Sequence, residues 1–132
     1  VSEYVANYNL NTELPLPFTP PFSSLLNIEY RIPELSKLLR NSFVNLGTRF
    51  TAAQNRVDRN EQPTDGYILL NFGLGTEFHI GKQQINFLVN IQNLLDTRYM
   101  NHLSRYRWLN LPEQGRNASV SLIFPFKIAK NE

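Results

Sequence analysis

Apolar and polar residues alternate along most of the chain, which predicts β-strands rather than helices. Over residues 22–31, most even positions from Phe22 to Tyr30 are apolar, and most odd positions are polar. A period of two places one face of a strand against apolar surroundings and the other against water. The same alternation predicts further strands over residues 41–53, 67–80, 85–92 and 117–126.

Two weaker patterns complete the expected secondary structure. Tyrosine and alanine residues share one parity over residues 3–9, which indicates a short sixth strand. Three leucines lie near helical spacing over residues 33–39, which predicts one helical turn between two strands. The sequence therefore predicts an all-β fold, an antiparallel meander of five or six strands.

The connections between the expected strands differ in length. Residues 81–84 form a hairpin-length turn and residues 32–40 an intermediate one, whereas 9–21, 54–66 and 93–115 are long. Alternate connections of a meander lie at the same end of the sheet, so the long loops should gather at one end. This asymmetry is typical of outer-membrane β-barrels, although a soluble sandwich or barrel shows the same period in its strands. A membrane barrel needs at least about eight strands, so this chain would form only part of one.

Composition narrows the functional classes further. The chain has 132 residues, which suits a single domain, and a formal net charge of only +2, which argues against a nucleic-acid partner. Cysteine is absent, so disulfides, thiolate metal sites and cysteine nucleophiles are excluded. The longest apolar runs are far shorter than the 18 or so residues of a membrane-spanning helix.

The residues that could carry chemistry do not form a catalytic set. His79 and His102 each lack a second histidine at helical metal-ligand spacing, and Ser36 and Ser104 lack a nearby base. The glycines of Gly73-Leu-Gly75 do not precede a helix, as a dinucleotide loop would require. We therefore expect no enzyme activity, no metal and no cofactor.

One loop combines planar cations with aromatic surface. Arg105, Tyr106, Arg107 and Trp108 are consecutive in the longest connection. Arginine and aromatic side chains together suit the binding of an anionic or aromatic ligand, and they suit a loop at a membrane interface equally well. This loop is the candidate ligand-binding site.

The segment Val89-Asn-Ile-Gln-Asn-Leu-Leu-Asp-Thr-Arg-Tyr99, followed by Leu111-Pro-Glu-Gln-Gly-Arg-Asn117 and an alternating strand to Phe126, resembles the C-terminal end of TonB-dependent outer-membrane receptors. Residues 15–21 and 63–67 are similar to the segments that precede strands in that family. The family commonly ends on its last aromatic residue, whereas residues 127–132 follow here.

The resemblance implies that residues 1–126 are the C-terminal portion of a transmembrane barrel of about 22 strands with a plugged lumen, and that residues 127–132 are a tail. It implies that Phe124 and Phe126 form a signal for the barrel-assembly machinery. Structural roles, at the end of one strand and the start of the next, fall to Asn93, Asp96, Tyr99, Gly115, Arg116 and Asn117.

The function implied is import of a scarce nutrient across the bacterial outer membrane. Ferric siderophores are the commonest substrates of the family, with haem, cobalamin and glycans as alternatives. The implied partners are outer-membrane lipid, the barrel-assembly machinery, and the TonB complex through an N-terminal part that this chain lacks. The competing hypothesis is a soluble β-barrel or sandwich that binds a ligand or another protein, with the apolar face as its dry core.

Overall fold

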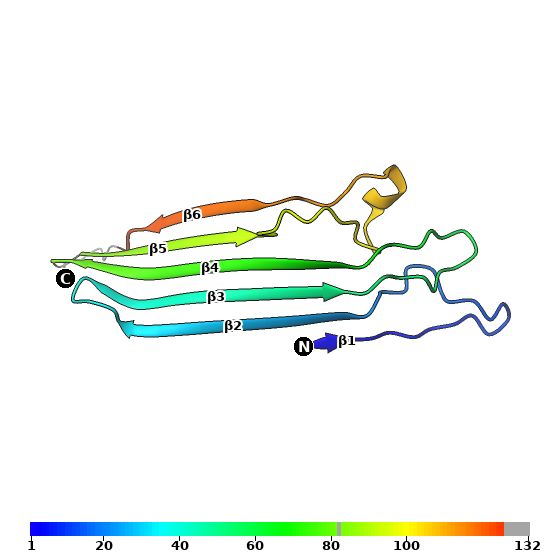
Figure 1. Cartoon of the computed structure of the whole chain (residues 1–132), viewed down its shortest axis with the longest axis horizontal. Helices are drawn as coiled ribbons and strands as arrows, with labels where there is room; N and C mark the ends of the chain where they lie inside the picture. Colours follow the sequence, from blue (N-terminus) through cyan, green and yellow to red (C-terminus); the bar gives the residue numbers. More distant parts are fainter. Residues whose placement is uncertain (82, 126–132) are drawn as a thin grey trace, which may run out of the picture.

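The computed structural model describes residues 1–81 and 83–125, and it confirms the all-β meander. Six antiparallel strands form one sheet in the order of the sequence (Figure 1). A short 3₁₀ helix, η1 (Arg105–Leu109), lies in the last connection. The strands are β1 (Ser2–Glu3), β2 (Ser23–Glu34), β3 (Leu39–Thr51), β4 (Tyr67–Ile80), β5 (Gln83–Gln92) and β6 (Asn117–Ile123).

The register aligns side chains of the same character across the strands. One row joins Ile28, Leu46, Phe72 and Ile91, so that apolar side chains from four strands lie side by side. The neighbouring row, one residue along, joins Asn27, Gly47 and Asn71. Since successive side chains of a strand point to opposite faces, the sheet has one mainly apolar face and one mainly polar face.

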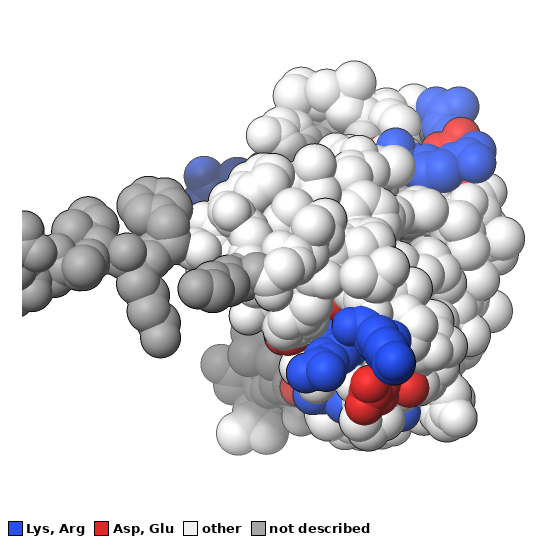
Figure 2. All heavy atoms as spheres, turned by 90° about the vertical axis from the view of Figure 1, so that its left-hand side faces the viewer, with Lys and Arg blue, Asp and Glu red and all other residues white. Residues whose placement is uncertain are grey.

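The sheet has no hydrophobic core within residues 1–81 and 83–125, where no large apolar side chain is buried. Tyr30 is 69% exposed, Val120 65% and Leu26 60%. A sheet normally covers its apolar face with a second layer, and this sheet is a single layer (Figure 1). Viewed from the end with the short turns, charged side chains gather in small groups and leave most of the visible surface uncharged (Figure 2).

The long connections all lie at one end of the sheet, as expected. The 4–22, 52–66 and 93–116 loops extend from one end, and the two short turns lie at the other (Figure 1). Gly81, in the β4–β5 turn, has a φ of +63°, a conformation that glycine adopts without a steric penalty.

The predicted helical turn over residues 33–39 is wrong. β2 continues through Pro33 to Glu34, and the chain reverses over 35–38 with a hydrogen bond from Leu35 N to Leu39 O of 3.0 Å. Proline is tolerated there because β1 pairs only with the first residues of β2, so the missing N–H lies on an unpaired edge. The hairpin register overrides the helical spacing of the leucines.

Two predicted strand boundaries also differ from the structure. The strand expected over residues 3–9 is only Ser2–Glu3, because the chain then forms a separate turn in which Tyr8 bridges Pro15. The last strand ends at Ile123, so Phe124 lies beyond β6 and is 51% exposed. Phe126 and the predicted tail over 127–132 lie outside the described residues.

Candidate functional site at the long-loop end

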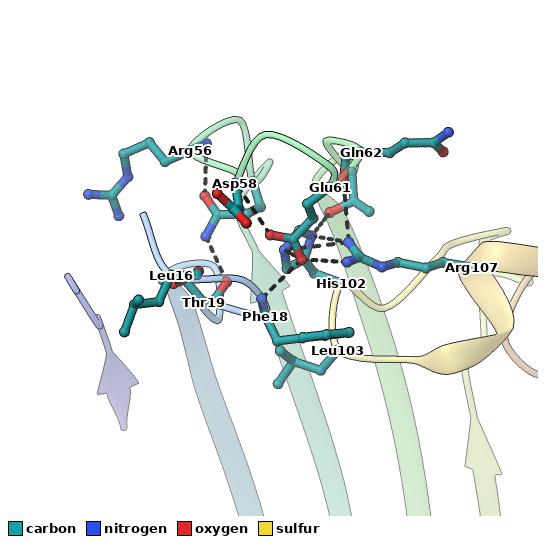
Figure 3. A network of polar contacts seen from close by, with 12 residues as sticks. Leu16, Phe18, Thr19, Arg56, Asp58, Glu61, Gln62, His102, Leu103 and Arg107 are labelled. Carbon is teal, nitrogen blue, oxygen red and sulfur yellow. Dashed lines mark hydrogen bonds and ion pairs between the residues drawn. The ribbon is translucent and has the colours of Figure 1, made fainter. Parts of the chain in front are cut away.

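A buried carboxylate joins the three long loops. Glu61, in the 52–66 loop, is only 9% exposed. Its Oε1 accepts a hydrogen bond of 3.0 Å from the backbone N–H of Phe18 in the 4–22 loop, and one of 2.5 Å from Arg107 Nη2 in the 93–116 loop. Figure 3 shows these contacts converging on one carboxylate. Glu61 therefore links segments that are more than 40 residues apart in the chain.

His102 is the most deeply buried side chain of this site, at 1% exposure. Its Nδ1 lies 2.9 Å from Arg107 Nη1 and 2.9 Å from Thr64 Oγ1, and its Nε2 lies 3.3 Å from Glu61 Oε1. A guanidinium can only donate hydrogen bonds, so Nδ1 must accept and the ring proton must lie on Nε2, facing the carboxylate. We call Glu61, Thr64, His102 and Arg107 the loop cluster.

Arg107 is held by more than its ion pair. Its Nη1 also donates to the backbone oxygen of Gln62 at 3.3 Å, and its Cζ lies 5.4 Å from the centre of the Phe18 ring and 5.3 Å from that of Trp108. Its Nε is buried without a hydrogen-bond partner among the described residues. A buried arginine that contacts Phe18 of the 4–22 loop and Glu61 of the 52–66 loop makes each loop depend on its neighbours.

The environment shifts the pKa of both titratable partners of Arg107. Burial favours the neutral form of Glu61, but hydrogen bonds from Arg107 and from the N–H groups of Phe18 and Asp58 outweigh it and lower the pKa of the carboxyl. Burial, and then the charge of Arg107, lower the pKa of His102. At neutral pH the loop cluster thus contains one anion, one cation and a neutral imidazole.

Local sequence explains how η1 presents its side chains. Ser104 precedes η1 and its Oγ accepts a hydrogen bond of 3.3 Å from Tyr106 N, whereas Asn110 ends the helix with a φ of +53°. In this single turn Arg107 points inward, while Tyr106 and Trp108 are 60% and 54% exposed.

The structure therefore divides the four residues of the candidate ligand-binding loop. Arg107 is engaged with Glu61, while Arg105, Tyr106 and Trp108 lie on the surface. Ligand binding by this loop stays a prediction.

Two neighbouring cavities lie between the 52–66 and 93–116 loops. One has a volume of about 540 Å³ and is lined by residues that include Asp65, Tyr67, Arg98 and Tyr99. The other, of about 410 Å³, is lined by residues that include Arg107 and Trp108. Both share Pro63, Thr64 and Met100 as lining residues. The two cavities offer aromatic surface beside polar and charged groups, which suits a small polar ligand with an apolar part.

Most of the residues predicted to have structural roles around the last two strands make contacts within the connection between those strands. Asn93 has a φ of +50°, and its side chain exchanges two hydrogen bonds of 2.9 Å with the backbone of Thr97. Asp96 Oδ1 accepts a hydrogen bond of 2.8 Å from Arg116 N, at the other end of the loop. A Cβ on Gly115 would lie 2.8 Å from that same oxygen, so only glycine fits there without a shift.

Tyr99 and Asn117 complete this set. The ring of Tyr99 lies 4.4 Å from that of Tyr67, centre to centre, and burial raises the pKa of its hydroxyl. Asn117 is the exposed first residue of β6. Asn93, Asp96, Gly115 and Arg116 thus contact one another or Thr97 between β5 and β6, whereas the structural roles of Tyr99 and Asn117 stay predictions.

Sequence reasoning missed Glu61 and Thr64 and treated His102 as an ordinary loop histidine. Glu61 lies in a polar loop with no periodicity, and nothing local pairs it with an arginine 46 residues later. The buried loop cluster could be found only from the structure.

No protein-family model matches this chain, and no curated protein matches it either. Within the described residues, no three histidine, aspartate or glutamate side chains are grouped so that they could hold a metal ion. No helix of that part of the chain is long and apolar enough to cross a membrane.

Proposed function

We propose that this chain is a segment of the wall of a larger β-barrel in the bacterial outer membrane, and that the whole protein imports a scarce nutrient. The single observation that carries the proposal is a one-layer sheet whose apolar face is left uncovered. In water such a face costs free energy in proportion to its area, about 25 cal/mol per Å². Lipid would cover it without a second protein layer.

The two faces and two ends of the sheet support the same arrangement. The polar face carries amides and charges, such as Asn27, Glu29 and Asn45, as the water-filled or plugged interior of a large barrel would. The long loops at one end and the short turns at the other match the outer and inner ends of such barrels. The resemblance of the last two strands to TonB-dependent receptors names the class of transporter.

Under this proposal the long loops contact the ligand and the strands form the wall. The cavities between the 52–66 and 93–116 loops, together with the exposed side chains of η1, are the candidate ligand contacts. Ferric siderophores are the substrate class that the resemblance favours. The barrel-assembly machinery and the TonB complex would be its partners, and no step requires an enzyme.

The soluble module remains the second hypothesis. The sequence pattern is compatible with it, but a compact sandwich or closed barrel buries its apolar face, and the described residues leave that face open. A soluble form would therefore have to cover the face with another protein layer.

Cysteine labelling in cells tests the proposal, because the chain has no cysteine of its own. Arg59→Cys lies in the long-loop end, and Lys37→Cys is its matched control in a short turn at the opposite end. With a membrane-impermeant maleimide, intact cells should label Arg59→Cys only, and lysed cells should label both. The protein should fractionate with the outer membrane.

A second pair of variants tests which face meets lipid. Nitroxide labels at Leu46→Cys and Asn45→Cys lie on opposite faces of β3. Lipid-soluble oxygen should relax the first label, and a water-soluble nickel chelate the second. A soluble, membrane-free protein, or equal response of both labels, would reject the barrel-wall assignment and favour the soluble module. Loss of ferric-siderophore uptake on gene deletion tests the substrate class separately.

A further inference from the structure

The loop cluster contains a histidine whose Nδ1 faces the guanidinium of Arg107, a group that can only donate hydrogen bonds. His102 is 1% exposed, so water cannot solvate an imidazolium there. The single lone pair of its Nδ1 faces two donors, Arg107 Nη1 and Thr64 Oγ1, each 2.9 Å away. A proton on Nδ1 would point at the N–H group of Arg107, so two donors would face each other. It would also place two cations, the imidazolium and the guanidinium, beside the single carboxylate of Glu61.

We propose that the loop cluster is an acid-sensitive latch, in which protonation of His102 expels Arg107 and releases η1 from the 52–66 loop. The inference goes beyond the proposed function and holds whether the apolar face meets lipid or protein. It concerns the cavity of about 410 Å³, because the lining includes Arg107 and Trp108 of η1 and Gln62 of the 52–66 loop.

The contacts of His102 determine which of its partners must move away when the ring gains a second proton. A doubly protonated His102 keeps Glu61 as the acceptor for Nε2–H, and Thr64 Oγ1, 2.9 Å from Nδ1, can turn from donor to acceptor. Arg107 has no such freedom, because every group of a guanidinium is a donor. The arginine must therefore withdraw, and its contact with the Phe18 ring is lost with it.

The charged groups that face His102 are few. Arg107 faces it from its own loop and Glu61 from the 52–66 loop, while the 4–22 loop contributes the uncharged Phe18. The latched state lowers the pKa of His102, so it binds fewer protons than the open state. The free energy that protonation contributes in favour of the latched state is therefore largest above about pH 6.5, the ordinary pKa of histidine. It is lost as the pH falls toward the lowered pKa that His102 has in the latched state. The ratio of open to latched protein should rise by up to tenfold per pH unit in that window.

Paired nitroxide labels on the intact protein test the latch. Arg59→Cys and Leu109→Cys are exposed sites in the 52–66 loop and in η1. Their distance distribution, measured by pulsed electron paramagnetic resonance, should be narrow at pH 7.5 and should broaden to longer distances at pH 5. An unchanged distribution would overturn the proposal.

Two histidine variants assign the effect. His102→Gln can accept from Arg107 and donate to Glu61 but cannot gain a proton, so the labels should stay close at pH 5. His79→Gln, at the other end of the sheet, replaces the only other histidine of the chain and should open as the wild type does. Opening of His102→Gln with the wild-type midpoint would refute the latch.

A measurement on the wild-type histidines keeps the proposal testable if His102→Gln folds poorly. The ring signals of His102 should titrate with the same midpoint as the distance change, with the His79 signals identified through His79→Gln. A clear separation of the two midpoints would show that another group opens the loops.

Discussion

Replacing Glu61 with glutamine is expected to loosen the three long loops while leaving the sheet intact. The glutamine keeps the size of the side chain but removes the charge that balances the buried Arg107. Its amide oxygen can still accept from Phe18 N or from the guanidinium, at reduced strength. The sheet should not respond, because Glu61 contacts only loop residues.

The magnitude follows from the contacts that are weakened. Hydrogen bonds to charged groups contribute about 1.5–3 kcal/mol each, and removing one partner of a buried pair costs about 3–5 kcal/mol. Arg107 keeps the Gln62 oxygen and His102 as partners, so the cost should lie below that of a fully unpaired buried charge. We expect the variant to lower the free energy of loop opening by about 2–3 kcal/mol. Hydrogen exchange of the 52–66 and 93–116 loops should then accelerate roughly 30- to 150-fold, since each 1.4 kcal/mol is a factor of ten.

The assay is hydrogen–deuterium exchange of the intact protein, read by peptide at neutral pH. Glu34→Gln is the matched control, since that glutamate is exposed at the short-turn end. Loops that exchange no faster than in the wild type would refute the view that the ion pair holds them. Acceleration spread evenly over β2 to β5 would refute the separation of loops from sheet.

A double variant distinguishes the loss of the ion pair between Glu61 and Arg107 from a general loss of stability caused by either substitution. Arg107→Met alone leaves Glu61 buried without its cation, whereas Arg107→Met with Glu61→Gln removes both charges. The combined loss of protection should fall short of the sum of the single losses by at least about 1 kcal/mol. Additive losses would mean that the two side chains act independently.

The remaining predictions concern close contacts in the sheet and at its end. Gly75→Ala should lower the free energy of unfolding by about 1–3 kcal/mol, because its Cβ would lie 2.3 Å from Phe43 Cε1. Gly73→Ala, whose Cβ meets only ordinary contacts of 3.5 Å and more, should change the free energy of unfolding by less than about 0.5 kcal/mol. Denaturant titration of the two glycine variants measures both changes. Asn93→Ala should cost about 1–3 kcal/mol and speed exchange at Thr97, as it removes both bonds to that residue; unchanged exchange there would count against the turn's role.

Local pattern determined most of the sheet. The period of two assigned the strands that became β2 to β6, and it assigned their side chains to faces that the register then aligned. It succeeded because each strand alternates independently of its partners, so no long-range contact is needed to read it. Loop lengths likewise predicted that the long connections share one end, since a meander reverses direction at each turn.

The failures occurred where a contact distant in sequence outweighs a local preference. Leucines at helical spacing over 33–39 lie in a hairpin because pairing of β2 with β3 extends to Glu34 and Arg40. The short tyrosine pattern near the start of the chain is mostly not a strand, because only Ser2 and Glu3 pair with β2.

The loop cluster was decided by tertiary structure alone. In the sequence, Arg107 is one of the four consecutive arginine and aromatic residues 105–108. Glu61 is one of several acidic residues in the 52–66 loop. The loop lengths predicted that the two loops share one end of the sheet, but only the tertiary structure buries the carboxylate, the guanidinium and His102 together there. Alternation reports which face a strand side chain occupies, but a loop has no period, so the burial of its charges depends on which partners the fold brings within reach.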